Sequence, residues 1–243
     1  MLSKRQTKTY IIFGGTPIKT NNFTLLCKDD ELENIISSIN STHAEDYTAC
    51  HGRYHADFVA NMVEYILTAL SYDERTIETG KIAGLLHDIG CIDGKKEHAK
   101  RSALMCEKFL NKTDLTAAEK SIITQAIYDH SNGDNIMSPV GAALLIADKI
   151  NVSKDRVLNP ADSNTYHKNL LEVLQVDMSV LDSTIIINYI STDKFSPKVL
   201  FELWSKAFTV PVKAAKYLNC SCEFRINNEA IRTTTTPSTE PTT

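Results

Sequence analysis

Six histidines and aspartates of this sequence could carry chemistry, because they fall on or beside the apolar faces of expected helices. They are His55, His87, Asp88, His98, His130 and Asp148. In the stretch 53–70, for example, apolar residues recur at helical spacing and His55 takes one position of that stripe, so its ring is expected to face the core. A single histidine in such a place is usually a core residue bonded to a carbonyl. Two buried carboxylates are different, since each would cost several kcal/mol without a compensating partner, and a shared cation explains them best.

The donor set predicts a catalytic metal centre. Imidazole nitrogens and carboxylate oxygens around an open position suit Fe, Mn, Co, Ni or Zn, and the absence of a thiolate from the set argues against a closed structural zinc site. His87 and Asp88 end an apolar segment together, so both side chains can enter one cavity and Asp88 could bridge two metal ions. A metal ion brings the pKa of bound water near neutrality and holds phosphoryl oxygens. Attack on phosphorus is therefore the expected chemistry.

The elements that must position these residues are helices. From about residue 43 to residue 156 the hydrophobic pattern is helical, and it is interrupted where Gly, Pro, Asn and Asp gather, at 88–94, 111–114 and 131–139. Ahead of this region, Tyr10–Gly14 is a short apolar run, and 30–39 is an amphipathic segment that Asp29 or Asp30 could cap. We expect the N-terminal part to serve as a brace or lid.

The pattern changes after Pro160. A β-branched run within 182–191 predicts a strand, 197–218 a helix and 222–226 a second strand. The Thr-rich stretch 232–243 has nothing to bury and is predicted to be disordered. We therefore expect a mostly α protein with a small C-terminal α/β appendage. Its expected divisions are a brace or lid (1–42), a metal-binding helical domain (43–160), the appendage (161–230) and a disordered tail (231–243).

Composition narrows the class of protein. With 243 residues, of which 42% are hydrophobic, the chain can bury a full core. The net charge of -4 and the sequence pI near 6.0 give no basic excess for nucleic acid or an anionic membrane. No apolar run reaches the roughly 20 residues that cross a bilayer, and the start is polar, unlike a signal peptide. The six cysteines are scattered, as expected for free thiols in a reducing cytoplasm, so a cytoplasmic location is expected.

The order of the ligand residues resembles the HD superfamily of metal-dependent phosphohydrolases. The family pattern is a first histidine, a His-Asp doublet and a distant aspartate, which His55, His87–Asp88 and Asp148 match in order and spacing. His98 and His130 match the two further histidines of the subset with a dinuclear centre. The likeness covers about residues 50–158. It implies an HD-domain helical bundle in which the six residues hold two divalent ions, Fe or Mn first and Zn, Co or Ni otherwise, with His87 and Asp88 at the catalytic centre.

A closer likeness is to uncharacterised bacterial HD proteins with a C-terminal α/β piece. They share Ser138-Pro139-Val140 before the last ligand helix, Asp148-Lys149 and Arg156-Val157. The chain lacks the Gly-Tyr-Pro element of the cyclic-dinucleotide phosphodiesterases, and it lacks the Glu-Asp pair of the alarmone hydrolases. His51, one helical turn before His55, is an alternative first ligand, but the position of Val59 fits the family pattern better with His55.

Three basic residues are expected to bind the substrate. Lys149 follows a ligand and Arg156 lies two turns onward, so both could border the cavity, where a guanidinium matches phosphate oxygens. Cys91 stands where many HD proteins have a phosphate-binding lysine, and Lys95 could reach the same place. Such residues are more often solvated or salt-bridged surface groups.

The leading interpretation is hydrolysis of a phosphoester or phosphoanhydride in a nucleotide or related small molecule. The same ligand set would also serve a diiron oxygenase, which would consume oxygen with an organic substrate. A third interpretation is a regulatory module that binds a nucleotide in the cavity without turnover. The expected partner is the small-molecule phosphate substrate, and neither membrane nor nucleic acid is expected. The sequence also allows a homodimer. The metal motif does not determine the substrate.

Overall fold

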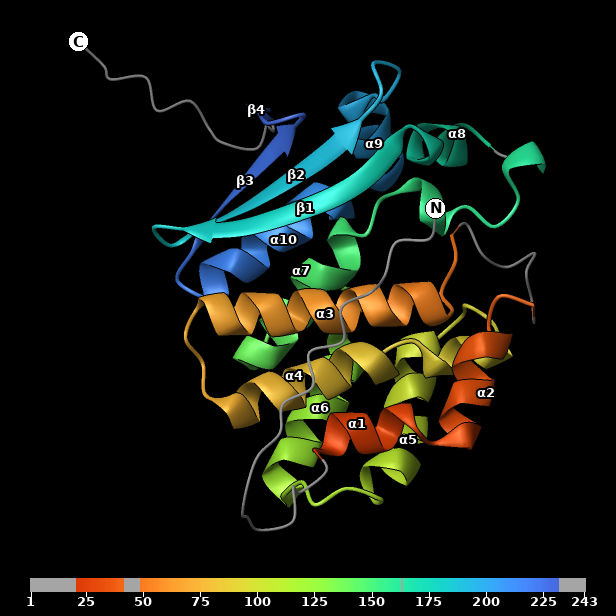
Figure 1. The fold of residues 1–243 in the computed structure, drawn as a ribbon, viewed down its shortest axis with the longest axis vertical. Coiled ribbons are helices and arrows are strands. Elements are labelled where there is room, and N and C mark those ends of the chain that lie inside the picture. Colours follow the sequence, from red (N-terminus) through yellow and green to blue (C-terminus); the bar gives the residue numbers. More distant parts are fainter. Residues whose placement is uncertain (1–20, 42–48, 163, 232–243) are drawn as a thin grey trace, which may run out of the picture.

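The computed structural model describes residues 21–41, 49–162 and 164–231. The expected mostly α fold with a small C-terminal α/β appendage is confirmed, because helices fill most of the described chain and one four-stranded sheet lies in its last third (Figure 1). The apolar run Tyr10–Gly14 and residues 232–243 of the predicted tail lie outside the described residues.

Seven α-helices precede the appendage within the described residues. Short 3-10 helices lie between α4 and α5 and after α7. The α-helices are α1 (Asn22–Cys27), α2 (Asp30–Ser38), α3 (Arg53–Ala69), α4 (Glu74–Leu86), α5 (His98–Leu110), α6 (Ala117–Asp129) and α7 (Pro139–Ile150). The 3-10 helices are η2 (Ile89–Asp93), η3 (Lys154–Arg156) and η4 (Pro160–Asp162). The interruptions predicted at 88–94, 111–114 and 131–139 lie between α-helices, although the first contains η2 and Pro139 already begins α7.

Side-chain caps fix where these helices begin. Asp29 accepts a hydrogen bond from the amide of Leu32 and so caps α2, as predicted. Thr116 and Glu119 form a capping box at the start of α6. Ser138 caps α7, and Pro139 follows in the first turn, where its missing amide N–H costs nothing.

Helix α7 is the central element of the core. Every residue from Val140 to Ile150 is buried, as expected of a helix that is covered on all sides. It packs against α3, α4, α6 and α10 (Lys206–Tyr217). A single hydrophobic cluster runs from Leu26 to Phe224, so the appendage shares its core with the helical part.

Helices α3 and α4 approach each other closely at Gly84. A Cβ atom placed on Gly84 would lie 2.7 Å from the Cα atom of Ala60, so no larger residue fits without moving a backbone. This contact holds the C-terminal end of α4 against the first half of α3, where His55 lies.

The appendage combines helices with a mixed sheet. Its elements are α8 (Thr165–Leu171), β1 (Val173–Leu181), β2 (Thr184–Ser191), α9 (Pro197–Trp204), α10, β3 (Ser221–Ile226) and β4 (Glu229–Ala230). The sheet order is β1-β2-β3-β4, with β2 and β3 parallel and the other pairs antiparallel. The helices α9 and α10 form the crossover between the parallel strands, and α10 packs on β3 and α7.

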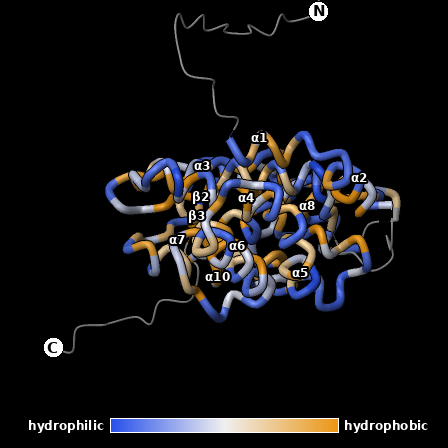
Figure 2. Tube along the Cα trace, turned by 90° about the horizontal axis from the view of Figure 1, so that it is seen from below, coloured by the Kyte–Doolittle hydropathy of each residue, from blue (hydrophilic) through white to orange (hydrophobic). Residues whose placement is uncertain are grey.

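The appendage differs in part from the sequence expectation. The helix α8 and the strands β1 and β4 were not predicted, and the single helix expected over 197–218 is two helices that meet at Ser205. Figure 2 shows hydrophobic and hydrophilic stretches alternating along the helices, as amphipathic packing requires. Within the described part of the chain, no helix combines the length and the apolarity that a membrane span needs.

Candidate metal centre

Three histidines of the centre are held by the same local bond. His87 follows α4, His98 begins α5 and His130 follows α6, and in each the ring Nδ1 contacts the carbonyl three residues earlier. The carbonyls belong to Gly84 (2.8 Å), Lys95 (2.8 Å) and Ile127 (2.6 Å). Because Nδ1 must donate to a carbonyl, it carries the ring proton, and the lone pair of Nε2 is left to face the cluster.

A tight turn brings His98 to the doublet. A Cβ atom on Gly90 would lie 2.5 Å from the carbonyl oxygen of His98, so only glycine lets η2 pack this closely on α5. The amide of Gly90 donates to Ser102 Oγ at 2.8 Å, and Glu97 adopts a left-handed backbone with φ of 55° just before α5. The predicted glycine turn therefore positions His98 as well as Asp88.

Asp88 faces two separate groups of histidines, one with each carboxylate oxygen. From Oδ2 the nearest ring nitrogens are His51 Nδ1 (2.8 Å), His87 Nε2 (3.2 Å) and His55 Nε2 (3.5 Å). From Oδ1 they are His130 Nε2 (3.3 Å) and His98 Nε2 (3.4 Å). Asp88 is only 3% exposed, and among the described residues Oδ1 accepts no hydrogen bond of acceptable geometry. A buried carboxylate oxygen in this state is suited to a cation.

The histidines meet in pairs through their Nε2 atoms. His55 Nε2 and His87 Nε2 are 3.2 Å apart, and His98 Nε2 and His130 Nε2 are 3.1 Å apart. Two nitrogens on one metal ion at bonds of roughly 2.1 Å would lie about 3.0–3.4 Å apart. The pairs therefore have the spacing that shared metal ligands require.

Asp148 completes the first group. Its Oδ1 lies 3.3 Å from His55 Nε2 and 4.0 Å from His87 Nε2.

Four overlapping sets of residues are close enough to hold a metal ion, and one of them includes the thiol of Cys91 beside Asp88 and His98. The sequence expectation placed Cys91 beside the doublet but included no thiol among the ligands.

The carboxylates of the centre are ionised. Burial alone would raise the pKa of Asp88, but the nearby His87 and His51 hold this pKa well below its usual value. Burial also opposes the charge of Asp148, whose pKa is nevertheless well below the usual value because the ammonium of Lys149 lies beside it. The Lys149 Nζ to Asp148 Oδ2 distance is 2.5 Å.

Three buried imidazoles, those of His51, His55 and His130, have lowered pKa values, which favours their neutral form. Burial lowers the pKa of His130 and of His55, with Arg156 adding to the effect on His55. Burial also brings the pKa of His51 down to about 3. For His87 burial acts in the same direction, but the Asp88 carboxylate outweighs it and raises the pKa. Ionised carboxylates among neutral imidazoles are the protonation states that divalent metals bind.

The surroundings of His55 involve Asn151 and Arg156. Asn151 Nδ2 lies 2.9 Å and Arg156 Nη1 2.7 Å from His55 Nδ1, so two donors face one ring nitrogen. A His55 that binds metal through Nε2 needs an acceptor at Nδ1 instead. The buried Asn151 Oδ1 has no partner among the described residues, and exchanging the amide oxygen and nitrogen would supply that acceptor. Arg156 Nη1 would then keep only the Asn151 carbonyl, at 3.4 Å.

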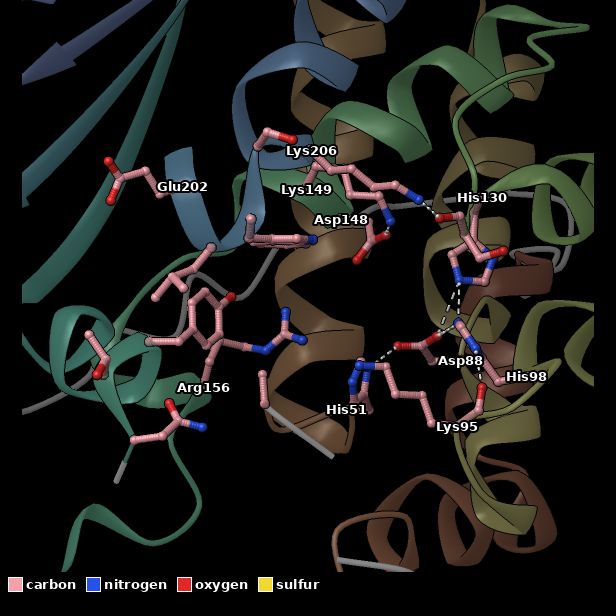
Figure 3. A pocket seen from close by; sticks show the side chains of 18 residues that line it. His51, Asp88, Lys95, His98, His130, Asp148, Lys149, Arg156, Glu202 and Lys206 are labelled. Atoms are coloured by element: carbon pink, nitrogen blue, oxygen red, sulfur yellow. Dashed lines mark hydrogen bonds and ion pairs between the residues drawn. The ribbon is translucent and has the colours of Figure 1, made fainter. Parts of the chain in front are cut away.

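The cluster opens into a pocket of about 810 Å³. This volume lies in the range of small-molecule sites. The pocket is lined by His51, Asp88, His98, His130 and Asp148 and by four basic residues, Lys95, Lys149, Arg156 and Lys206 (Figure 3). His55 and His87 are fully buried and do not line it. Access to the cluster is therefore from the side of His51 and His98.

Arg156 is a buried cation at this pocket. The residue is 4% exposed, its Nε has no hydrogen-bond partner, and no carboxylate of the described chain forms an ion pair with it. A guanidinium without a carboxylate at a pocket wall is suited to an anionic ligand.

All six residues predicted as ligands lie together, and the three predicted substrate contacts, Lys95, Lys149 and Arg156, line the pocket. The sequence reasoning ranked His51 second to His55, whereas both belong to the cluster. Helical spacing could not show this, because His51 lies ahead of the N-cap Gly52 and outside α3, which begins at Arg53. Lys206 and the wall formed by α8 and α9 were not predicted.

No protein-family model matches this chain, and no curated protein matches it. The geometry of the site therefore carries the functional argument.

Proposed function

We propose that this protein is a metal-dependent phosphohydrolase of the HD type. Its substrate would be a phosphoester or phosphoanhydride of a nucleotide or related small molecule. The observation that carries the proposal is Asp88, whose two oxygens face different histidine groups at the floor of a basic pocket.

The donor set fits two divalent ions. Asp88 Oδ2 with His55, His87 and Asp148 would hold one, and Asp88 Oδ1 with His98 and His130 would hold the other. When bound, such ions supply Lewis-acid activation of water and of phosphoryl oxygens. Iron or manganese suits these nitrogen and oxygen donors, and zinc, cobalt or nickel would also bind.

The remaining residues hold the substrate and the ligands in place. Arg156 would bind phosphoryl oxygens through its guanidinium, whose Nε has no partner among the described residues. Lys149 and Lys95 would add positive charge, and Lys149 also keeps Asp148 ionised. His51 orients Asp88 through the 2.8 Å contact with Oδ2. Such fixed charges, set before the substrate arrives, are the main means by which enzymes stabilise phosphoryl transfer.

The first experiment measures the metal content. Protein purified with and without oxygen would be analysed by plasma mass spectrometry beside a His87→Ala/Asp88→Ala variant, with His167→Ala as a histidine control outside the cluster. We expect about two iron or manganese ions per chain, lost in the double variant and kept in the control. About one ion would restrict the centre to one of the two groups, and no metal under either condition would contradict the proposal.

A second experiment tests the reaction. Metal-loaded protein would be assayed against phosphodiesters and a broad set of nucleotides for released phosphate or nucleotide. Hydrolysis should disappear in the double variant. Retained metal without any hydrolysis, or oxygen consumption in place of phosphate release, would overturn the assignment.

A further inference from the structure

The outer wall of the pocket belongs to the appendage. Helix α8 contributes Asn164 at its N-cap, Thr165 and Tyr166, and the end of α9 contributes residues 202–204. In Figure 3, Arg156 and Lys149 lie between Asp88 and Glu202, so the pocket has a metal-cluster end and an appendage end.

The appendage end is aromatic. The rings of Tyr166 and Trp204 lie with their centroids 6.1 Å apart at an interplanar angle of 86°, and both side chains are partly exposed. In such an edge-to-face pair only one ring face is covered by the other ring, so the pair can still offer a face to a third planar ring. An aromatic wall offers no interaction to a phosphate group, but a planar, aromatic group can stack on it.

Polar groups surround the aromatic pair. The side-chain oxygen of Asn164 caps α8 by accepting from the amide of His167 at 2.9 Å, which leaves the amide nitrogen as a donor. Glu202 also lies at this end, but its carboxylate points away from the metal cluster and is 3.8 Å from Lys198 Nζ. Lys206, whose Nζ donates to the Ser131 carbonyl at 3.2 Å, adds positive charge between the two ends. Hydrogen-bonding groups around an aromatic wall match the edge of a nucleobase.

We infer that the appendage recognises the base of a nucleotide. The base stacks on the Trp204–Tyr166 pair while Arg156 holds the phosphate beside the metal cluster. Trp204 is thus a specificity-determining residue, and the appendage selects nucleotides over phosphates that lack a base. For the phosphate end the inference rests on the proposed function, whereas the base contact can be measured without any turnover.

Trp204 is the only tryptophan of the chain, so its fluorescence reports on this wall directly. Full-length protein, metal-loaded and after treatment with EDTA, would be titrated with AMP, GMP, UMP and ribose 5-phosphate. We expect at least one of the nucleotides to change the Trp204 emission and to bind roughly ten-fold or more tightly than ribose 5-phosphate, as one base stacked on an aromatic side chain allows.

Calorimetry on variants then assigns the effect. Trp204→Ala should remove the preference for the nucleotide over ribose 5-phosphate, whereas Trp204→Phe, which keeps an aromatic face, should retain most of it. Tyr217→Ala, an exposed tyrosine on α10 outside the pocket, is the control and should bind like the parent protein. If Trp204→Ala does not fold by circular dichroism, Tyr166→Leu serves as the second test and should weaken nucleotide binding.

The two proposals fail separately. Equal affinity for all four probes with unchanged Trp204 emission would overturn the base contact, even if the protein hydrolyses ribose 5-phosphate. Nucleotide binding that depends on Trp204 would support the base contact, even if no phosphate is released.

Discussion

Arg156 is the residue whose surroundings are least explained by folding alone. It is buried, and in the described chain it pairs with no carboxylate and leaves Nε without an acceptor. Burying a charge without a partner costs several kcal/mol in effective terms. A group kept in this state is expected to act on a ligand rather than to stabilise the fold.

We expect Arg156→Met to separate function from stability. Loss of charged hydrogen bonds to phosphate should cost about 2 kcal/mol of transition-state binding, or roughly a 30-fold drop in kcat/KM. The melting temperature should stay the same or rise, because an unpaired buried charge is replaced by an apolar chain. Arg225→Met, which removes an arginine paired with Glu223 in the appendage, is the matched control for the assay. A variant that loses stability but keeps its kcat/KM would show that Arg156 is structural.

The sequence predicted which histidines and aspartates would meet, but not all of their neighbours. His55 and Asp148 could be placed because helical periodicity tells which face of a helix is buried. Periodicity does not tell which distant helix covers that face, so Trp204 could not be assigned to the pocket. The sequence analysis gave Lys149 a role in substrate binding, but it did not predict the contact between its ammonium and Asp148.

At the level of elements, the crossing of α3 and α4 determines the distance between two of the proposed ligands. His55 lies in α3, His87 follows α4, and Gly84 is the point of closest approach. A change in this crossing should therefore affect the metal centre as well as the core.

We expect Gly84→Ala to reduce both stability and metal content. Forcing the added methyl group against the Ala60 backbone should cost about 1–3 kcal/mol and move the two histidines apart. Gly141→Ala is the control, since its Cβ atom would meet only ordinary contacts from 3.5 Å outward, and it should gain about 0.5–1 kcal/mol from helix propensity. Urea unfolding and metal analysis of both variants would test this. Equal behaviour of the two would contradict the role of the crossing.

A second prediction concerns Glu119, which joins α6 to α4. Its carboxylate accepts from Thr116 in the capping box and pairs with Arg75, and the Arg75 bond lowers its pKa from 4.5 to about 2. A pKa that is lower in the folded state gives stability that is complete above pH 4.5 and lost as the pH falls toward 2.

Glu119→Gln should therefore lose about 1 kcal/mol at pH 7, a modest value because Arg75 is 41% exposed. The difference from the parent protein should shrink as the pH falls through that window, measured by urea unfolding at several pH values. Glu107→Gln, at an exposed site on α5, should show no such trend. A constant difference at all pH values would contradict the ionic explanation.

The helices and strands were predictable where the apolar residues recur with one clear period along the sequence. The helices from α3 to α7 follow from apolar spacing and turn residues. The strand β1 was missed because its polar residues, among them Gln175 and Asp177, lie on a face that the sheet leaves mostly exposed. The break at Ser205 has no strong sequence signal, since the residues around it could continue a helix.

For the whole molecule, the metal centre joins segments that are far apart in the chain. The six residues proposed as ligands come from α3 and α7 and from the ends of α4, α5 and α6. Ligation should therefore stabilise the helical part as a unit, since an ion that binds only the folded state shifts the unfolding equilibrium by mass action.

Removing the metal should lower the melting temperature. At metal concentrations 100 times the dissociation constant, the gain is about 2.7 kcal/mol. Calorimetric scans with EDTA and after adding back Mn²⁺ or Fe²⁺ would measure the change, and the His87→Ala/Asp88→Ala variant should show none. A melting temperature that does not respond to metal in the parent protein would contradict ligation by the buried cluster.

The order of these parts along the chain has a consequence for how such proteins diverge. The proposed ligands lie between residues 55 and 148, whereas the aromatic pair comes later, at Tyr166 and Trp204. Substitutions in the later segment can change which molecule the pocket selects without changing any of the proposed metal ligands. A lineage built on this plan can acquire new substrates while it inherits its reaction unchanged.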